Sequence, residues 1–189
     1  MSRLSPLDPD NLTPDQQRVY DALRYGPRGD DKHKLELAGP FGVWVRAPEI
    51  GEAVQALGKI ARFGTSIKND IRELAICTTG AHFRAKFEFA VHRDLAHKAG
   101  IGSHVTEALR TGLTPEFDSE EYRLCHRLTT GLLTQHRIDD QTYSGAIDCW
   151  GETGVVELVN IIGYYSIVAL TLNAFEIPLS AGMSDPFPD

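Results

Sequence analysis

The run of residues from 155 to 175 is almost continuously apolar, and it constrains the fold more than any other stretch. It is about as long as the roughly 20 residues that a bilayer span requires. It nevertheless carries Glu157, Asn160 and Asn173, and no basic residue follows it. In a soluble protein, a helix that is hydrophobic all round is the central core helix or part of a subunit interface. We therefore predict such a helix here, and no membrane span.

The rest of the chain also favours helices. Apolar residues recur three and four positions apart in residues 50–63, 67–79, 103–110, 122–135 and 139–150, and alternating strand patterns are essentially absent. Residues 13–25 begin with a threonine N-cap and a proline at the first helical position. Residues 35–48 hold too many glycines and prolines for a helix, and we expect them to pack irregularly. The chain thus predicts an all-α fold with a mostly irregular N-terminal segment.

Composition limits the domain count and the class of protein. A chain of 189 residues with 42% hydrophobic residues fits one globular domain, which we place over residues 13–180, between an arm at 1–12 and a loose tail at 181–189. A net charge of −7 without a basic cluster excludes a nucleic-acid surface. Three scattered cysteines without a C-x-x-C, and no apolar signal-peptide segment, predict a cytoplasmic protein.

The candidate site lies in residues 84–99. In a helix, Glu88 and His92 fall on the same side as Ala85, Leu95 and Ala96, whereas most charged residues collect on the other side. Burying a polar group without a partner costs roughly several kcal/mol, and a lone charge costs more. The pair must therefore bond to each other, to a third group, or to something in a pocket. Both a structural pair in the core and an acid–base pocket satisfy this requirement.

Glu73 is the expected third member of the site. In one straight helix it would lie about 28 Å from His92, at 1.5 Å per residue. A break at Gly80 permits a helical hairpin that returns Glu73 to the imidazole. A carboxylate on one ring nitrogen leaves the other nitrogen free to exchange a proton near neutral pH. Arg84, at the edge of the same side, and Trp44 are candidates for substrate contacts, although a solvated arginine and a core tryptophan are the alternatives.

The segment RELAICTTGAHFRAKFEFAVHRDLAHKAGI resembles the central signature of the carboxymuconolactone decarboxylase and alkylhydroperoxidase-D-like superfamily. That signature has a glutamate, eleven residues, C-x-x-C, three residues and a histidine. Glu73 and His92 take the glutamate and histidine positions, and the cysteine positions fall on Ala85 and Glu88. The chain is therefore similar to the branch that lacks C-x-x-C. The likeness covers about residues 15 to 180.

The resemblance implies an enzyme without a metal or organic cofactor that assembles into homo-oligomers, commonly trimers or hexamers. The namesake reaction is a carbon–carbon lyase step, in which a carboxylated muconolactone loses carbon dioxide on an aromatic-degradation route. We expect His92 as the acid/base, Glu88 as its proton partner and Glu73 as its orienting group. Thiol peroxidase chemistry is not expected, because the sulfur positions hold other residues.

Three questions stay open from the sequence. Glu73, Glu88 and His92 would also suit a carboxylate-rich metal site. The protein would otherwise be a non-catalytic helical oligomer with a structural Glu–His pair. Within the enzymatic interpretation, the same proton-transfer groups serve decarboxylation, isomerisation or dehydration of a small carboxylated lactone or a related acid.

Overall fold

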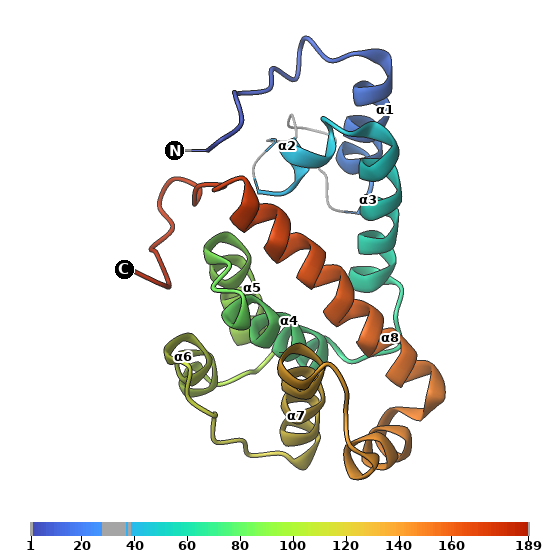
Figure 1. Cartoon of the computed structure of the whole chain (residues 1–189), viewed down its shortest axis with the longest axis vertical. Helices are drawn as coiled ribbons and strands as arrows, with labels where there is room; N and C mark the ends of the chain where they lie inside the picture. The colour runs from blue at the N-terminus through green and yellow to red at the C-terminus, as the bar shows by residue number, and fades with distance from the viewer. Residues whose placement is uncertain (1, 28–36, 38, 189) are drawn as a thin grey trace.

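The computed structural model describes residues 2–27, 37 and 39–188, and within these residues it contains helices and no β-strand (Figure 1). This confirms the all-α prediction. The helices are α1 (Pro14–Arg24), α2 (Phe41–Trp44), α3 (Pro48–Phe63), α4 (Asn69–His82), α5 (Lys86–Lys98), α6 (Ser103–Thr111), α7 (Glu120–Gln135) and α8 (Asp140–Ala174). The prediction of an irregular segment before residue 48 is wrong in one place, because α2 makes a single helical turn there.

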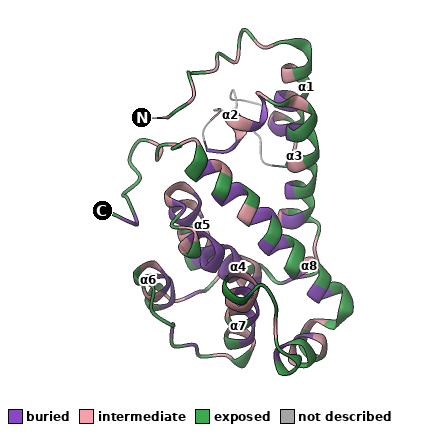
Figure 2. Ribbon diagram, in the orientation of Figure 1, coloured by how far each residue is buried: buried purple, intermediate pink, exposed green. Residues whose placement is uncertain are grey.

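The long helix α8 runs diagonally through the molecule and packs against α3, α4, α5 and α7 (Figure 1). It joins the two helices predicted at 139–150 and 155–175, and Gly151 between them departs from helical geometry with φ 66° and ψ 173°. One side of α8 is buried and the other is exposed (Figure 2). Its length and composition would allow a membrane span, but half of its most apolar window is buried within the fold, as in a core helix.

The helices α4 and α5 form the antiparallel hairpin that positions the candidate site. The predicted break at Gly80 is wrong, since α4 continues to His82 and the chain reverses over Phe83 to Ala85. Arg84 takes the left-handed conformation in this turn, with φ 49°. Gly80 instead lies where the two helices approach closely: a β-carbon there would be 3.3 Å from Oε1 of Glu88. A larger residue would therefore press on the Glu88 carboxyl.

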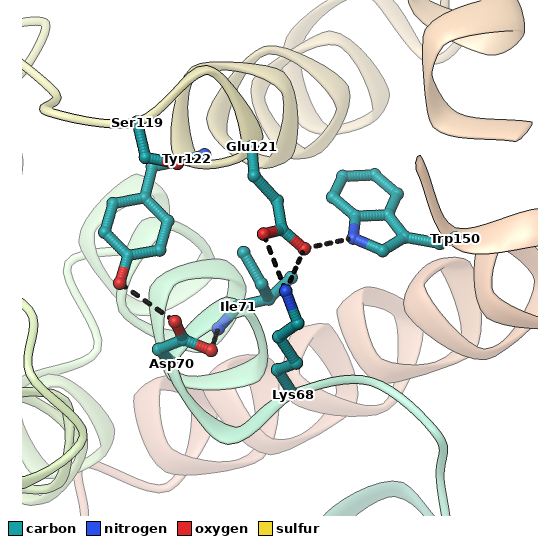
Figure 3. A network of polar contacts seen from close by, with 7 residues as sticks. All are labelled: Lys68, Asp70, Ile71, Ser119, Glu121, Tyr122 and Trp150. Atoms are coloured by element: carbon teal, nitrogen blue, oxygen red, sulfur yellow. Dashed lines mark hydrogen bonds and ion pairs between the residues drawn. The ribbon is translucent and has the colours of Figure 1, made fainter. Parts of the chain in front are cut away.

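A polar network ties the start of α4 to α7 and α8 (Figure 3). The carboxylate of Glu121 accepts hydrogen bonds from Nζ of Lys68, at 2.9 Å to Oε2, and from Nε1 of Trp150, at 3.0 Å to Oε1. The Tyr122 hydroxyl donates to Oδ2 of Asp70 at 2.9 Å. These contacts join segments far apart in the sequence, and they fix the end of α4 that precedes Glu73.

Both terminal segments are anchored to the fold. The backbone N–H of Arg3 donates to the Phe175 carbonyl at 3.0 Å, and the Arg3 guanidinium pairs with Glu176 at 2.6 Å. The segment expected as a loose tail is held by Phe187, which is only 2% exposed. The Phe187 ring lies 5.0 Å from that of Phe89, centroid to centroid. The sequence missed this anchor because a single aromatic residue among prolines and aspartates has no periodicity.

Candidate functional site

The hairpin brings Glu73 and His92 together, as predicted. Oε2 of Glu73, on α4, lies 2.7 Å from Nδ1 of His92, on α5. Glu73 is fully buried and His92 is 8% exposed. At this distance and burial the two side chains form a specific hydrogen-bonded pair, and the imidazole is held from its Nδ1 side.

A third side chain, Arg62, reaches the same carboxylate from α3. Its Nη1 donates to Oε1 of Glu73 at 2.9 Å, and its side chain is 20% exposed. The sequence analysis did not select this residue. A signal was present, because Arg62 follows Val54 and Gly58 at helical spacing and so extends the inward side of α3. An arginine on an otherwise apolar side needs a buried partner, which the sequence alone does not identify.

The second carboxyl, that of Glu88, has the opposite environment. Glu88 is 2% exposed, and neither of its oxygens has a hydrogen-bond partner among the described residues. Burial raises the pKa of Glu88 well above its ordinary value. Burial thus favours the neutral acid form of this side chain. Of the alternatives left open by the sequence, a hydrogen bond between Glu88 and His92 is not formed, whereas His92 bonds to a third group, Glu73.

Glu88 and His92 line one cavity of about 290 Å³ between α3, α5 and α8. Its other walls are mostly apolar and aromatic: Pro40, Phe41, Arg62, Phe63, Phe87, Val91, Leu95, Tyr164, Tyr165, Val168 and Leu172. A cavity of about 150 Å³ already holds benzene. The volume is thus sufficient for one ring-sized molecule, and an apolar cavity with a few polar groups is typical of small-molecule sites.

The protonation state of His92 follows from its neighbours. Burial lowers the pKa of His92 below its ordinary 6.5, and the hydrogen bond to Glu73 opposes that effect in part. The pKa of Glu73 is lowered: burial raises it, but the contacts with His92 and Arg62 outweigh burial. A carboxylate can only accept, so the neutral imidazole carries its proton on Nδ1. Nε2 then holds a lone pair that can take a proton.

The two candidate substrate contacts lie away from this cavity. Arg84 is exposed in the hairpin turn, where its guanidinium stacks on the Phe187 ring at 5.2 Å and borders a separate hollow beside the end of α8. Trp44 is 4% exposed and packs against the rings of Phe41 and Tyr164, at 5.9 and 6.2 Å between centroids. Trp44 thus supports the cavity wall from behind.

The described residues also bear on the metal interpretation. Within them, no three His, Cys, Asp or Glu side chains lie together as a ligand set. The two oxygens of Glu73 are taken by the Arg62 guanidinium and the His92 ring. The positive charge of Arg62 therefore lies beside the Glu73 carboxylate that a metal ion would need as a ligand.

Comparison with protein-family models finds none that matches the chain, and comparison with curated proteins finds no matching sequence. The resemblance to the carboxymuconolactone decarboxylase family therefore stays a prediction that depends on the quoted signature. The geometry of the site is an independent observation: Glu88 and His92 line one cavity, and burial shifts the pKa of each toward its neutral form.

Proposed function

We propose that the protein is a cofactor-independent carbon–carbon lyase of the carboxymuconolactone decarboxylase kind, acting on a small carboxylated lactone or a related ring acid. The observation that carries the proposal concerns Glu88: its buried carboxyl has no partner among the described residues, and the residue lines the same cavity as His92. A structural pair would be complete with Glu73, His92 and Arg62. An additional unsatisfied buried carboxyl costs stability, and such groups concentrate at functional sites.

The protonation states assign a role to each group. In decarboxylation the bond between the ring and its carboxylate breaks, carbon dioxide leaves, and the electron pair moves into the conjugated lactone. The carbon then takes a proton, which neutral Glu88 can supply and later recover from water. We sought the donor in His92 from the sequence, but the geometry favours Glu88, because the neutral imidazole has its proton directed at Glu73. His92 is suited to accept a proton at Nε2.

The electrostatics of the cavity suit an anionic substrate. Arg62 and Glu73 cancel in charge, and Glu88 is neutral, so these groups place no net negative charge beside the ligand. The remaining walls are largely apolar. Removing water from a carboxylate in such surroundings favours its conversion to neutral carbon dioxide. A small ring with one carboxylate therefore matches both the size and the polarity of the cavity.

The test is carbon dioxide release from a panel of carboxylated lactones. His92→Ala and Glu88→Gln should each lose activity by about 10²–10⁴-fold, the usual contribution of general acid–base catalysis. The exposed residues His104 and Glu152 provide matched controls, and His104→Ala and Glu152→Gln should retain wild-type rates. Circular dichroism and light scattering establish that each variant is folded and assembled. Release that is equal in wild type and in a folded double variant of Glu88 and His92 would contradict the proposal.

We further propose that the protein is a homo-oligomer in the cytoplasm, with the trimer or hexamer that the resemblance implies. The support is a set of exposed large apolar side chains on two helices that pack against each other, α3 and α8: Ile50, Leu57, Ile60, Phe63, Val156, Val159, Ile167 and Leu170. Contiguous exposed apolar surface is typical of protein interfaces. Since Phe63 also borders the cavity, a partner on this surface would lie close to the site.

A further inference from the structure

Arg62 enters the site from a helix outside the α4–α5 hairpin. We propose that Arg62 is a positioning residue: it keeps Glu73 ionised, and through Glu73 it fixes His92 as the tautomer whose Nε2 is free to accept a proton. The inference deepens the proposed function and rests on it for its catalytic meaning. The contacts that carry it are the 2.9 Å bond from Nη1 of Arg62 to Oε1 of Glu73 and the 2.7 Å bond from Oε2 of Glu73 to Nδ1 of His92.

The two carboxylate oxygens of Glu73 have different partners: Oε1 accepts from the Arg62 guanidinium, and Oε2 bonds to the neutral His92 ring. Because Glu73 is fully buried, it would favour its neutral form if no positive charge lay beside it. A neutral Glu73 has a proton of its own to donate, and Nδ1 of His92 could then accept it. That exchange would move the ring proton to Nε2 and remove the base from the cavity. Arg62 opposes this exchange because its charge stabilises the carboxylate.

Other ionisable groups surround the pair, and they do not replace Arg62. Those that face or adjoin it are Arg72 and Cys77 from α4, Glu88 and Arg93 from α5, and Tyr164 and Tyr165 from α8. Arg72 directs its guanidinium to the Ile67 carbonyl and to Asn69. Tyr165 lies beside Arg62 on the wall of the same cavity. In the described part of the chain, Arg62 is thus the cation that bonds to Glu73 directly.

The experiment is a pH titration of the His92 ring by NMR of protein labelled with ¹⁵N-histidine, without substrate. The chain has seven histidines, and the His92 signals are those lost in a His92→Gln variant. In the wild type, the neutral ring should be protonated at Nδ1. Arg62→Gln removes a positive charge at hydrogen-bond distance, so the pair should take up its proton at a pH higher by about 1–3 units.

Two further variants separate charge from structure. Arg62→Lys keeps the charge and should restore a titration close to the wild type. Arg93→Gln is the matched control, because Arg93 adjoins His92 in sequence but pairs with Asp94, and its loss should leave the midpoint in place.

An unchanged midpoint in folded Arg62→Gln would overturn the inference and leave Arg62 a structural ion pair. If Arg62→Gln does not fold, the wild-type tautomer decides alone: a neutral ring protonated at Nε2 would overturn the inference. Since no substrate is used, failure of the lactone screen would leave this result standing, and a changed titration would not by itself establish lyase activity.

Discussion

The buried Glu88 carboxyl predicts a pH dependence of stability that one substitution removes. Glu88→Gln keeps the shape of the side chain but carries no titratable proton. The amide has no partner in the described surroundings either, which adds a cost that does not vary with pH. The informative quantity is therefore the difference in the free energy of unfolding between the variant and the wild type, followed across pH. The contributions of Glu73 and His92 are common to both proteins and cancel in that difference.

The sign and size of the effect follow from linkage. The folded-state pKa of Glu88 is raised above its ordinary 4.5, so its contribution to stability is complete below the unfolded value and is lost as pH rises toward the folded value. In that interval the unfolded chain releases a proton that the folded chain keeps. The wild type should lose about 1.4 kcal/mol per pH unit relative to Glu88→Gln. For a chain of this length, that is about 3–6 °C in the melting temperature per pH unit.

The measurement is urea unfolding followed by circular dichroism from pH 4.5 to 8, at one protein concentration so that assembly does not vary. The exposed Glu152→Gln is the control, and its difference from the wild type should stay flat with pH. The Glu88→Gln difference should rise with pH and then level off where Glu88 ionises in the folded protein. A difference that is constant from pH 5 to pH 7 would show that Glu88 is ionised when folded, and the proton-donor role would fail with it.

Three more predictions follow from burial. The protein should not act as a thiol peroxidase, because only Cys149 of its three cysteines is exposed; peroxide consumption abolished by a thiol-blocking reagent would contradict this. Light scattering should give a multiple of 20.9 kDa. Leu170→Asp should reduce that mass, whereas the control Leu113→Asp, at an even more exposed leucine outside α3 and α8, should not. A monomer at micromolar concentration would refute the oligomer. Phe187→Ala should lower the free energy of unfolding by about 3–5 kcal/mol, because it removes a buried ring. The control Pro188→Ala, at an exposed position, should lower it by less than about 0.5 kcal/mol. Equal urea midpoints for Phe187→Ala and the wild type would show that the tail is not anchored.

The helices were predictable because each is encoded locally. Apolar side chains at helical spacing locate most of them, and the predicted N-cap Thr13 accepts the expected backbone hydrogen bond, from Gln16. The errors lie where a glycine has a tertiary role. A glycine such as Gly80 predicts a helix break, but in the structure α4 and α5 pack closely at this residue. Its neighbour there, Glu88, comes from the second helix of the hairpin, so the local sequence does not indicate the contact. Gly151 is a true local departure from helical geometry inside α8.

Three members of the candidate site were predictable, Glu73, Glu88 and His92, whereas Arg62 was missed. Helical spacing placed Glu88 and His92 on an inward side, and the possibility of a hairpin placed Glu73 near them. Spacing could not show that Arg84 would stack on Phe187 away from the cavity, because that contact involves a residue at the far end of the chain.

The opposite pKa shifts of Glu73 and Glu88 are the feature of the site that helical spacing could not predict. Both are buried on neighbouring helices, so from the sequence they look alike. Their pKa values move in opposite directions. The contacts with His92 and with Arg62 from α3 lower the pKa of Glu73, whereas burial without a donor in the described surroundings raises that of Glu88. Two carboxyl groups whose pKa values are moved in opposite directions are the usual basis for assigning acid and base roles in a site. The contacts that set this difference join separate helices, and the chemistry proposed for the cavity depends on them.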